Sequence, residues 1–261
     1  MSKSPYIAQY ILTIRFANRR FAPSLVGTLL VAVGVALFVN LGLWQLRRAD
    51  QKQQLQSAYE KGQQTTFALT EDGTSGLDRY QHVRARGRYV DDRQIVLDNM
   101  PSAHGRPGYR VLTPFELDSG AWLLVDRGWI PMGDRRGDLP QLHVEGDTRE
   151  VSGRLDELPR PGLRLGDDLP QLSATWPQLL NFPERETIER ALGTRIETYI
   201  LLLDASEPDG FEREWHMLTR FGPERHVGYA VQWFAFAFVA VVIYLSLSLR
   251  REQPADAARE D

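Results

Sequence analysis

The residues of this 261-residue chain that could do chemistry at neutral pH begin with five histidines. Four of them, His82, His104, His143 and His216, are scattered through the polar middle of the chain. No two of the five have the spacing of metal ligands, so we interpret these four as solvated or hydrogen-bonded structural histidines. Imidazole is nonetheless the commonest metal-binding side chain, and the position of the fifth histidine, His226, is different.

His226 is the last polar residue before a long apolar run. In a helix that advances by about 100° per residue, Trp233 lies about 20° from it and Tyr229 about 60°, so the three share one face. An imidazole with aromatic rings beside it could ligate a haem iron, with the rings against the macrocycle. The alternative is an interfacial histidine followed by the aromatic belt that many membrane helices carry.

A second group with possible chemistry lies in the segment Gly105–Pro131. The Gly-Arg-Pro-Gly sequence at its start predicts a turn that contains Arg106 and is followed by Arg110. Arg127 and Trp129 follow at the end of an apolar stretch. A hairpin of this kind could present arginines to a carboxylate, such as a propionate, or to a partner protein. The alternative is an ordinary hairpin capped by a tryptophan.

The chain lacks the residues and motifs that several other kinds of chemistry require. The chain has no cysteine, which excludes a thiolate nucleophile, a redox pair of cysteines and a thiolate metal site. None of the common hydrolase, metalloprotease, P-loop or dinucleotide-binding motifs is present. We therefore expect a protein that is not an enzyme, and no nucleic-acid partner.

The elements that must position these residues include two apolar runs. The mean hydropathy of −0.35 and the 25% of charged residues describe a soluble protein, but this average conceals Leu25–Trp44 and Val227–Leu249. About 20 apolar residues in a helix cover a hydrocarbon core of about 30 Å, so each run can cross a bilayer. We predict membrane-spanning helices at residues 24–44 and 227–249.

The basic residues beside these runs predict the orientation. The tail of residues 1–23 contains four basic residues, and the tail of residues 250–261 opens with Arg250 and Arg251. Short basic flanks stay on the cytoplasmic side, whereas a long loop is translocated largely regardless of its charge. Both termini should therefore be cytoplasmic and residues 45–226 should lie outside, which in a bacterial inner membrane means the periplasm.

The segment between the spans predicts one α+β domain on a mainly antiparallel sheet. Directly after the first span, Gln45–Gly62 lacks helix breakers and should continue the helix. A short helix is predicted at Pro183–Leu192, with Gly193 as its stop. Alternating or β-branched stretches predict strands at Gln81–Val90, Arg93–Asn99, Tyr109–Leu117, Ala121–Arg127, Thr148–Leu155 and Glu197–Asp204.

Small residues in the two spans predict how the spans contact each other. Gly27 and Gly34 lie two turns apart on one face of the first span. Ala230, Ala237 and Ala240 offer small surfaces on the second. Small residues let two helix backbones approach closely in a membrane, so we expect these residues to line the contact.

Taken together, these pieces resemble the Surfeit locus protein 1 family, whose members help to assemble cytochrome c oxidase. The similarity covers the whole chain except the two tails, and its motifs occur in the family's order around the two spans. They are GLWQLRR at Gly42–Arg48, GYRVLTPFEL at Gly108–Leu117, LLVDRGWIP at Leu123–Pro131 and RHVGYAVQWF at Arg225–Phe234.

The resemblance implies an inner-membrane assembly factor without catalytic turnover. Bacterial members are similar in being linked to the supply of haem a to oxidase subunit I, with haem a synthase as the donor. It places the proposed haem contact at His226, with Tyr229 and Trp233 beside it. One position departs from the motif, because Glu224 stands where an asparagine is expected.

Two other classes of function remain open at this point. One is a membrane scaffold that stabilises an oxidase assembly intermediate without binding haem. The other is a membrane-tethered sensor or an enzyme of unfamiliar type, although neither tail is long enough for a cytoplasmic output domain. Copper delivery is disfavoured, because the chain has no cysteine and only four methionines.

Overall fold

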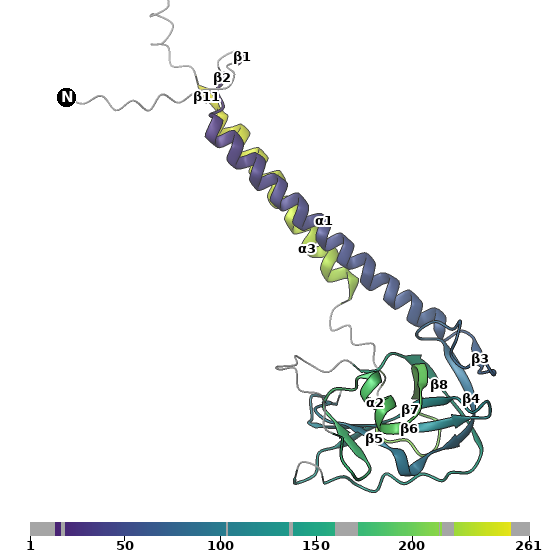
Figure 1. Cartoon of the computed structure of the whole chain (residues 1–261). Helices are drawn as coiled ribbons and strands as arrows, with labels where there is room; N and C mark the ends of the chain where they lie inside the picture. The colour runs from purple at the N-terminus through teal and green to yellow at the C-terminus, as the bar shows by residue number, and fades with distance from the viewer. Residues whose placement is uncertain are drawn as a thin grey trace, which may run out of the picture. The chain divides into compact units, whose positions relative to one another are not determined.

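A computed structural model of the chain describes residues 14–16, 19–102, 104–135, 138–159, 172–213, 215 and 222–251. The chain divides into two compact units, which are described separately below. One contains most of the first long helix and all of the last one, and the second is Gln56–Leu218 (Figure 1). Most of the two tails that we expected to be cytoplasmic, together with His216, lies outside the described residues.

The two long helices are α1, Leu25–Gly62, and α3, Pro223–Ser248. Ser24 caps the start of α1, because its Oγ accepts a hydrogen bond from the Gly27 N–H at 3.1 Å. Pro223 begins α3, at the helix position that tolerates the missing N–H. As predicted, α1 continues without a break from the apolar run through Gly62.

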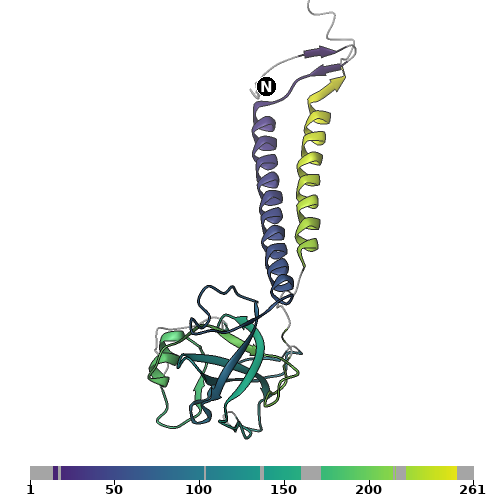
Figure 2. The same cartoon turned by 90° about the vertical axis from the view of Figure 1, so that its right-hand side faces the viewer.

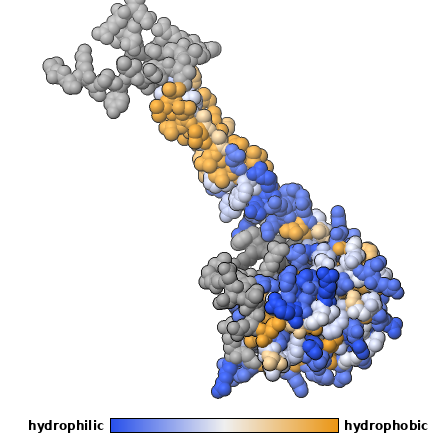
Figure 3. Space-filling view, viewed as in Figure 1, coloured by the Kyte–Doolittle hydropathy of each residue, from blue (hydrophilic) through white to orange (hydrophobic). Residues whose placement is uncertain are grey.

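Both helices are long and apolar enough to cross a membrane, and they are hardly covered by protein. Only 6% of the most apolar stretch of α1 and 11% of that of α3 is buried, whereas a core helix of a soluble protein would be mostly buried. Figure 3 shows apolar side chains gathered on the surface of these helices. The two helices are therefore compatible with a membrane protein.

The helices run antiparallel, side by side, with a regular seam between them (Figures 1 and 2). At one end the hydroxyls of Thr28 and Tyr244 lie 2.7 Å apart, and further along Phe38 stacks on Trp233 with ring centroids 5.9 Å apart. The less exposed positions alternate in steps of three and four residues, the spacing of coiled-coil a and d positions. They include 28, 31, 35, 38, 42 and 45 on α1, and 226, 230, 233, 237, 240 and 244 on α3.

The predicted glycine contacts are wrong, whereas all three predicted alanines occupy seam positions and two of them are buried. Ala230 and Ala237 are 1% and 7% exposed. A Cβ on Gly34 would meet open space, and one on Gly27 would meet only Ser24 of its own helix. The glycine that matters is Gly42, where a Cβ would lie 2.6 Å from the ring of Phe234. Large aromatic side chains fill this seam, so a glycine is needed only where a ring takes the space.

A short sheet joins the segments that flank the two helices. Its strands are β1, Ile14–Phe16, β2, Arg19–Phe21, and β11, Leu249–Arg251, in the order β1-β2-β11 with both pairs antiparallel. None of these three strands was predicted; we expected cytoplasmic tails at residues 1–23 and 250–261. The backbone pairing of β2 with β11 ties the start of α1 to the end of α3.

The second unit contains a closed five-stranded barrel with short strands added at its edges. Its strands are β3, Thr66–Ala68, β4, His82–Tyr89, β5, Ile95–Leu97, β6, Gly108–Leu117, β7, Trp122–Pro131, β8, Arg149–Asp156, β9, Gln178–Leu180, and β10, Ile196–Leu203. They pair in the order β3-β4-β8-β10-β7-β6-β5-β9, and an additional pairing of β4 with β6 closes the ring. The arrangement is that of a small Greek-key barrel.

Every predicted strand of this unit is present, and the sheet, which we expected to be mainly antiparallel, contains three parallel pairs. β10 runs parallel to β7, β3 to β4 and β5 to β9, while the remaining pairs are antiparallel. β3 and β9 were not predicted, because three residues are too few to show an alternating pattern. Closure could not be predicted, since it depends on the pairing of β4 with β6.

Side chains fill the barrel, and α2, Arg185–Leu192, covers part of its outside. Strand β10 shows why its apolar run is continuous: Leu201 and Leu203 point into the barrel, while Ile200 and Leu202 pack in the cluster that contains residues of α2. A strand buried on both faces has no polar alternation. The predicted helix is confirmed, and it stops at Gly193 in the left-handed conformation, φ 73°.

The last turns of α1, which belong to this unit, are anchored on the barrel. Tyr59 packs edge-on against Tyr80, with ring centroids 5.7 Å apart, and its hydroxyl accepts a hydrogen bond from Arg154 Nη1 at 2.7 Å. A Cβ on Gly62 would lie 2.1 Å from the Tyr80 carbonyl oxygen. The absent side chain of Gly62 therefore lets the helix end pass close to the barrel backbone.

We predict that Gly42→Leu disrupts the helix seam, whereas Gly34→Leu does not. The new side chain would occupy the space of the Phe234 ring, and overpacking costs about 1–3 kcal/mol. The chain has no cysteine, so Thr28→Cys with Tyr244→Cys allows the seam to be probed with a short bifunctional thiol crosslinker. Crosslinking should fall in Gly42→Leu only, and Phe234→Ala should restore it. Equal crosslinking in both leucine variants would refute the assignment of the seam.

Candidate functional site

The candidate site is built around His226, in the first turn of α3. Its Nδ1 lies 2.8 Å from Oε1 of Gln45 on α1, so the two helices bring together residues 181 positions apart. A side-chain amide oxygen can only accept, which makes Nδ1–H the donor. In the neutral ring, this is the tautomer in which Nε2 keeps its lone pair.

The other ring nitrogen is the one that could bind a metal. Among the described residues no protein partner contacts Nε2 of His226, and the side chain is only half-buried. A ligating histidine typically donates its second N–H to an oxygen in this manner, which fixes the ring orientation. The residues present therefore fit an axial ligand with an open side.

Aromatic rings lie below the histidine in the seam. Trp233 stacks with Phe38 at 5.9 Å between centroids and meets Phe236 edge-on at 5.8 Å. Trp233 thus lies on the α1-facing side with His226, whereas Tyr229 is 51% exposed at the flank of that face. Trp233 lies about 10 Å further along α3 than His226, so a planar apolar ligand held at the histidine would have to extend along the helix to contact these rings.

The arginines of the second predicted group are held within the barrel unit, and Arg127 is only 2% exposed. Its Nε donates to the Asp209 carbonyl at 2.6 Å and its Nη1 to the Leu142 carbonyl at 2.7 Å. The guanidinium also lies 4.9 Å from the centre of the Phe211 ring. Arg127 thus holds neighbouring loops against the barrel.

Arg110 pairs with a buried carboxylate. It forms an ion pair with Asp126, which is 0% exposed, and its guanidinium lies 5.0 Å from the centre of the Trp215 ring. Burial raises the pKa of the Asp126 carboxyl above its ordinary value, and the charge of Arg110 opposes that rise. Removing either partner would leave the other buried without its counter-charge.

Arg106 is the most accessible of the three arginines. Its Nη2 lies 2.7 Å from both carboxylate oxygens of Glu212, and its guanidinium stacks 4.7 Å from the centre of the Trp129 ring. Trp129 is 7% exposed and donates its indole N–H to the Met100 carbonyl at 2.8 Å. The ring fits because a Cβ on Gly108 would lie 2.5 Å from it. Arg106 and Trp129 are in contact in the structure, and each also has a polar partner of its own, Glu212 and the Met100 carbonyl.

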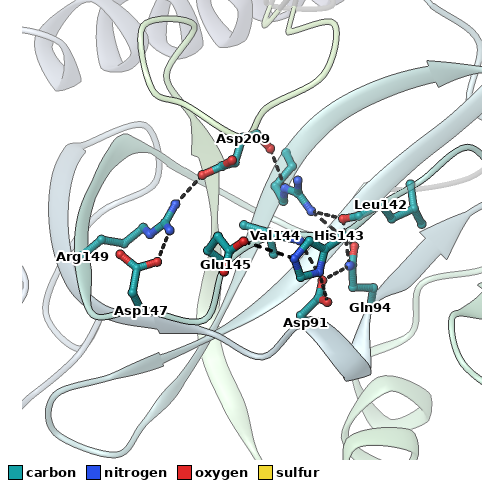
Figure 4. Close-up of polar contacts among 10 residues, drawn as sticks. Asp91, Gln94, Leu142, His143, Val144, Glu145, Asp147, Arg149 and Asp209 are labelled. Atoms are coloured by element: carbon teal, nitrogen blue, oxygen red, sulfur yellow. Dashed lines mark hydrogen bonds and ion pairs between the residues drawn. The ribbon is translucent and has the colours of Figure 1, made fainter.

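Figure 4 shows the polar network beside Arg127. His143 Nδ1 lies 2.6 Å from Asp91, which also accepts from the Val144 N–H at 2.9 Å. The hydrogen bond to Asp91 raises the pKa of His143 above its ordinary value. Gln94 donates to the Leu142 carbonyl at 2.9 Å. The network fixes the segment before β8 and presents no group of metal ligands.

The other histidines mostly follow their predicted roles. His82 lies 2.9 Å from the Thr66 hydroxyl and 2.7 Å from Asp204, so the interpretation of His82 and His143 as hydrogen-bonded side chains is confirmed. His104 is exposed beside the turn before β6. The described part of the chain contains no cluster of three or more His, Asp or Glu suited to a metal ion.

Comparison with known proteins shows the family to which the chain belongs. The sequence profile of the SURF1 family, the Surfeit locus protein 1 family named above, matches residues 32–238. The chain belongs to the SURF1 family. Proteins of this family are known in general as cytochrome oxidase assembly factors.

Individual SURF1 relatives are distant, and the bacterial ones match over most of their length. A SURF1-like protein of Rickettsia bellii is 24% identical over 220 residues, which cover 83% of this chain and 88% of the relative. An uncharacterised SURF1-like protein of Mycobacterium bovis is 24% identical over 244 residues, covering 88% and 87%. A SURF1-like protein of Drosophila melanogaster is 27% identical over 177 residues, covering 60% and 54%.

Two residues of the candidate site were not predicted from the sequence. Gln45 and Phe38 lie on α1, far in sequence from His226, and neither has an unusual residue type. A signal for Gln45 was present, since it falls within the GLWQLRR block that carries the resemblance. What the sequence lacked was the register of the two helices, which pairs position 45 with position 226.

We predict that Arg127→Leu strongly destabilises the barrel unit, whereas Arg86→Leu does not. The buried guanidinium of Arg127 makes two charged hydrogen bonds to main-chain carbonyls, whose loss should lower the free energy of unfolding by about 3 kcal/mol. The Arg86 side chain is 71% exposed in its ion pair with Asp118, and its loss should change stability by at most about 0.5 kcal/mol. Urea unfolding of the full chain, followed by tryptophan fluorescence, measures both. Equal midpoints would show that Arg127 is not structural.

Proposed function

We propose that this SURF1 protein takes up haem a and aids its insertion into subunit I of cytochrome c oxidase. The observation that carries the proposal is the His226–Gln45 pair, which leaves an imidazole lone pair open beside stacked aromatic rings. Haem a is cargo in this account, received from haem a synthase. Its iron would bind Nε2 of His226, with Tyr229 and Trp233 beside the macrocycle.

The surroundings of His226 suit capture and release. A single neutral imidazole gives one protein bond to iron, and a transfer protein needs a complex that dissociates readily. The half-buried ring at the start of α3 lies at the level where an apolar span meets the headgroups, which gives an amphiphilic haem direct access from the bilayer. The chain itself would bind and orient the cargo without chemical turnover, so we propose no enzymatic activity.

The proposed setting is a bacterial inner membrane. Helices α1 and α3 would cross the bilayer, both termini would be cytoplasmic and the barrel unit would face the periplasm. Among the three predicted arginines, Arg106 offers the most accessible guanidinium for a propionate or partner carboxylate, which would have to displace Glu212. Arg110, Arg127 and Trp129 would support that surface from within.

A scaffold that stabilises an oxidase assembly intermediate without binding haem is the second candidate. The exposed polar surface of the barrel unit and its many ion pairs would serve protein contacts equally well (Figure 3). In that case the His226–Gln45 bond would only join two helices. The presence or absence of haem a in the purified protein distinguishes the two functions.

We predict that His226→Ala removes haem a from the protein and leaves the fold intact. The full chain, co-expressed with a haem a synthase, should carry a Soret band and a haem a pyridine haemochrome spectrum. The side chain is half-buried, so its truncation opens no large cavity. His104→Ala is the matched control and should keep the band. A wild-type protein without haem would favour the scaffold, and loss of the band in His104→Ala would move the ligand there.

We predict that Ser119 lies in the periplasm and Ser2 in the cytoplasm. Ser119 is exposed in the turn between β6 and β7, and the chain has no native cysteine to interfere. In intact cells a membrane-impermeant maleimide that passes the outer membrane should label Ser119→Cys. It should label Ser2→Cys only after the inner membrane is broken. The reverse pattern would overturn the orientation.

A further inference from the structure

The hydrogen bond between Gln45 and His226 joins the two helices of the seam through side chains, and the bond between Thr28 and Tyr244 does the same. The Thr28–Tyr244 bond lies towards the opposite end of the pair and involves no group that could bind a metal. The two bonds have similar lengths, 2.7 and 2.8 Å. Thr28–Tyr244 therefore shows what a purely structural bond between these helices looks like.

The hydrogen bond at His226 selects the tautomer of an imidazole, which the Thr28–Tyr244 bond cannot do. A neutral imidazole has two tautomers, and an acceptor on one nitrogen decides which nitrogen keeps its lone pair. The Gln45 carbonyl oxygen accepts from Nδ1–H, which leaves the lone pair on Nε2. It also sets the plane of the ring, because the N–H must point at an oxygen held by α1.

The residue type of the acceptor has a consequence as well. A carboxylate acceptor would draw the Nδ1 proton strongly and make the imidazole a more basic ligand. The amide oxygen of Gln45 is neutral and is a weaker acceptor. It orients the ring without strengthening the iron bond to the extent that a carboxylate would, which is the compromise that a hand-over site requires.

We propose that Gln45 is the positioning residue of the site: it holds His226 in the Nδ1–H tautomer, with Nε2 presented to the haem iron as a ligand of moderate basicity. The haem part of this inference rests on the proposed function, whereas the tautomer is a property of the haem-free protein. The two parts can therefore fail separately.

The first test uses the haem-free full chain, labelled with ¹⁵N-histidine in detergent micelles. Long-range ¹H–¹⁵N spectra distinguish the two tautomers, and the signals of His226 are those lost in His226→Gln. Wild type and Gln45→Glu should show the Nδ1–H form. Gln45→Leu should shift His226 towards the Nε2–H form, and Tyr244→Phe should not. A wild-type His226 in the Nε2–H form would overturn the proposal whatever haem does.

The second test titrates wild type, Gln45→Leu, Gln45→Glu and Tyr244→Phe with haem a. Gln45→Leu should raise the dissociation constant about 10- to 100-fold, the usual effect of losing such a partner. Gln45→Glu should lower it and shift the midpoint potential to a more negative value, because a more basic imidazole favours ferric iron. Tyr244→Phe should leave the dissociation constant and the midpoint potential unchanged. If the role of Gln45 were purely structural, all three variants would bind haem a more weakly by a similar factor.

The outcomes separate the two claims. If the tautomer result holds but wild type binds no haem a, the proposed function fails while the assignment of the hydrogen bond stands. If wild type binds haem a and Gln45→Leu binds it equally well with an unchanged potential, the positioning role is wrong. The proposed function then stands with His226 alone.

Discussion

The antiparallel seam between α1 and α3 is the constraint on which the candidate site depends. Side chains at steps of three and four residues interlock along it, and this register decides which residue of α1 meets which residue of α3. Phe38 stacks on Trp233, Gly42 makes room for Phe234, and Gln45 reaches His226. A shift of one residue along either helix would break all of these contacts.

The seam is also a solution to the problem of polar groups in apolar helices. Lipid offers no hydrogen-bond partner, so a polar side chain in a span must find one in the protein. Thr28 pairs with Tyr244, and Asn40 donates to the Ala36 carbonyl of its own helix at 2.8 Å. Gln45 and His226 satisfy one donor of the imidazole and leave Nε2 without a partner among the described residues. Because Nε2 has no partner there, we interpret the Gln45–His226 pair as a candidate ligand-binding site.

The barrel unit follows a different physical logic. Its strands close on themselves and its interior is filled by apolar side chains. Several exposed arginines of β4 pair with carboxylates. Arg127 shows how misleading residue type can be, because a guanidinium that looks ready for a ligand is buried and bonded to main-chain carbonyls. Buried backbone carbonyls need donors, and arginine has five N–H groups to supply them.

The sequence by itself determined the elements that depend on local pattern. Two uncharged apolar runs predicted the long helices, alternating residues predicted the main strands, and the motif blocks identified the family, with His226 as the residue of interest. Hydrophobic length, residue alternation and glycine stops are properties of neighbouring residues, which a single chain displays openly. The tertiary structure alone decided the closure of the barrel, the choice of Gly42 over Gly34, the burial of Arg127 and the partnership of Gln45 with His226. Each of these depends on contacts between segments far apart in the chain, and their register is set by side-chain packing that no local pattern encodes.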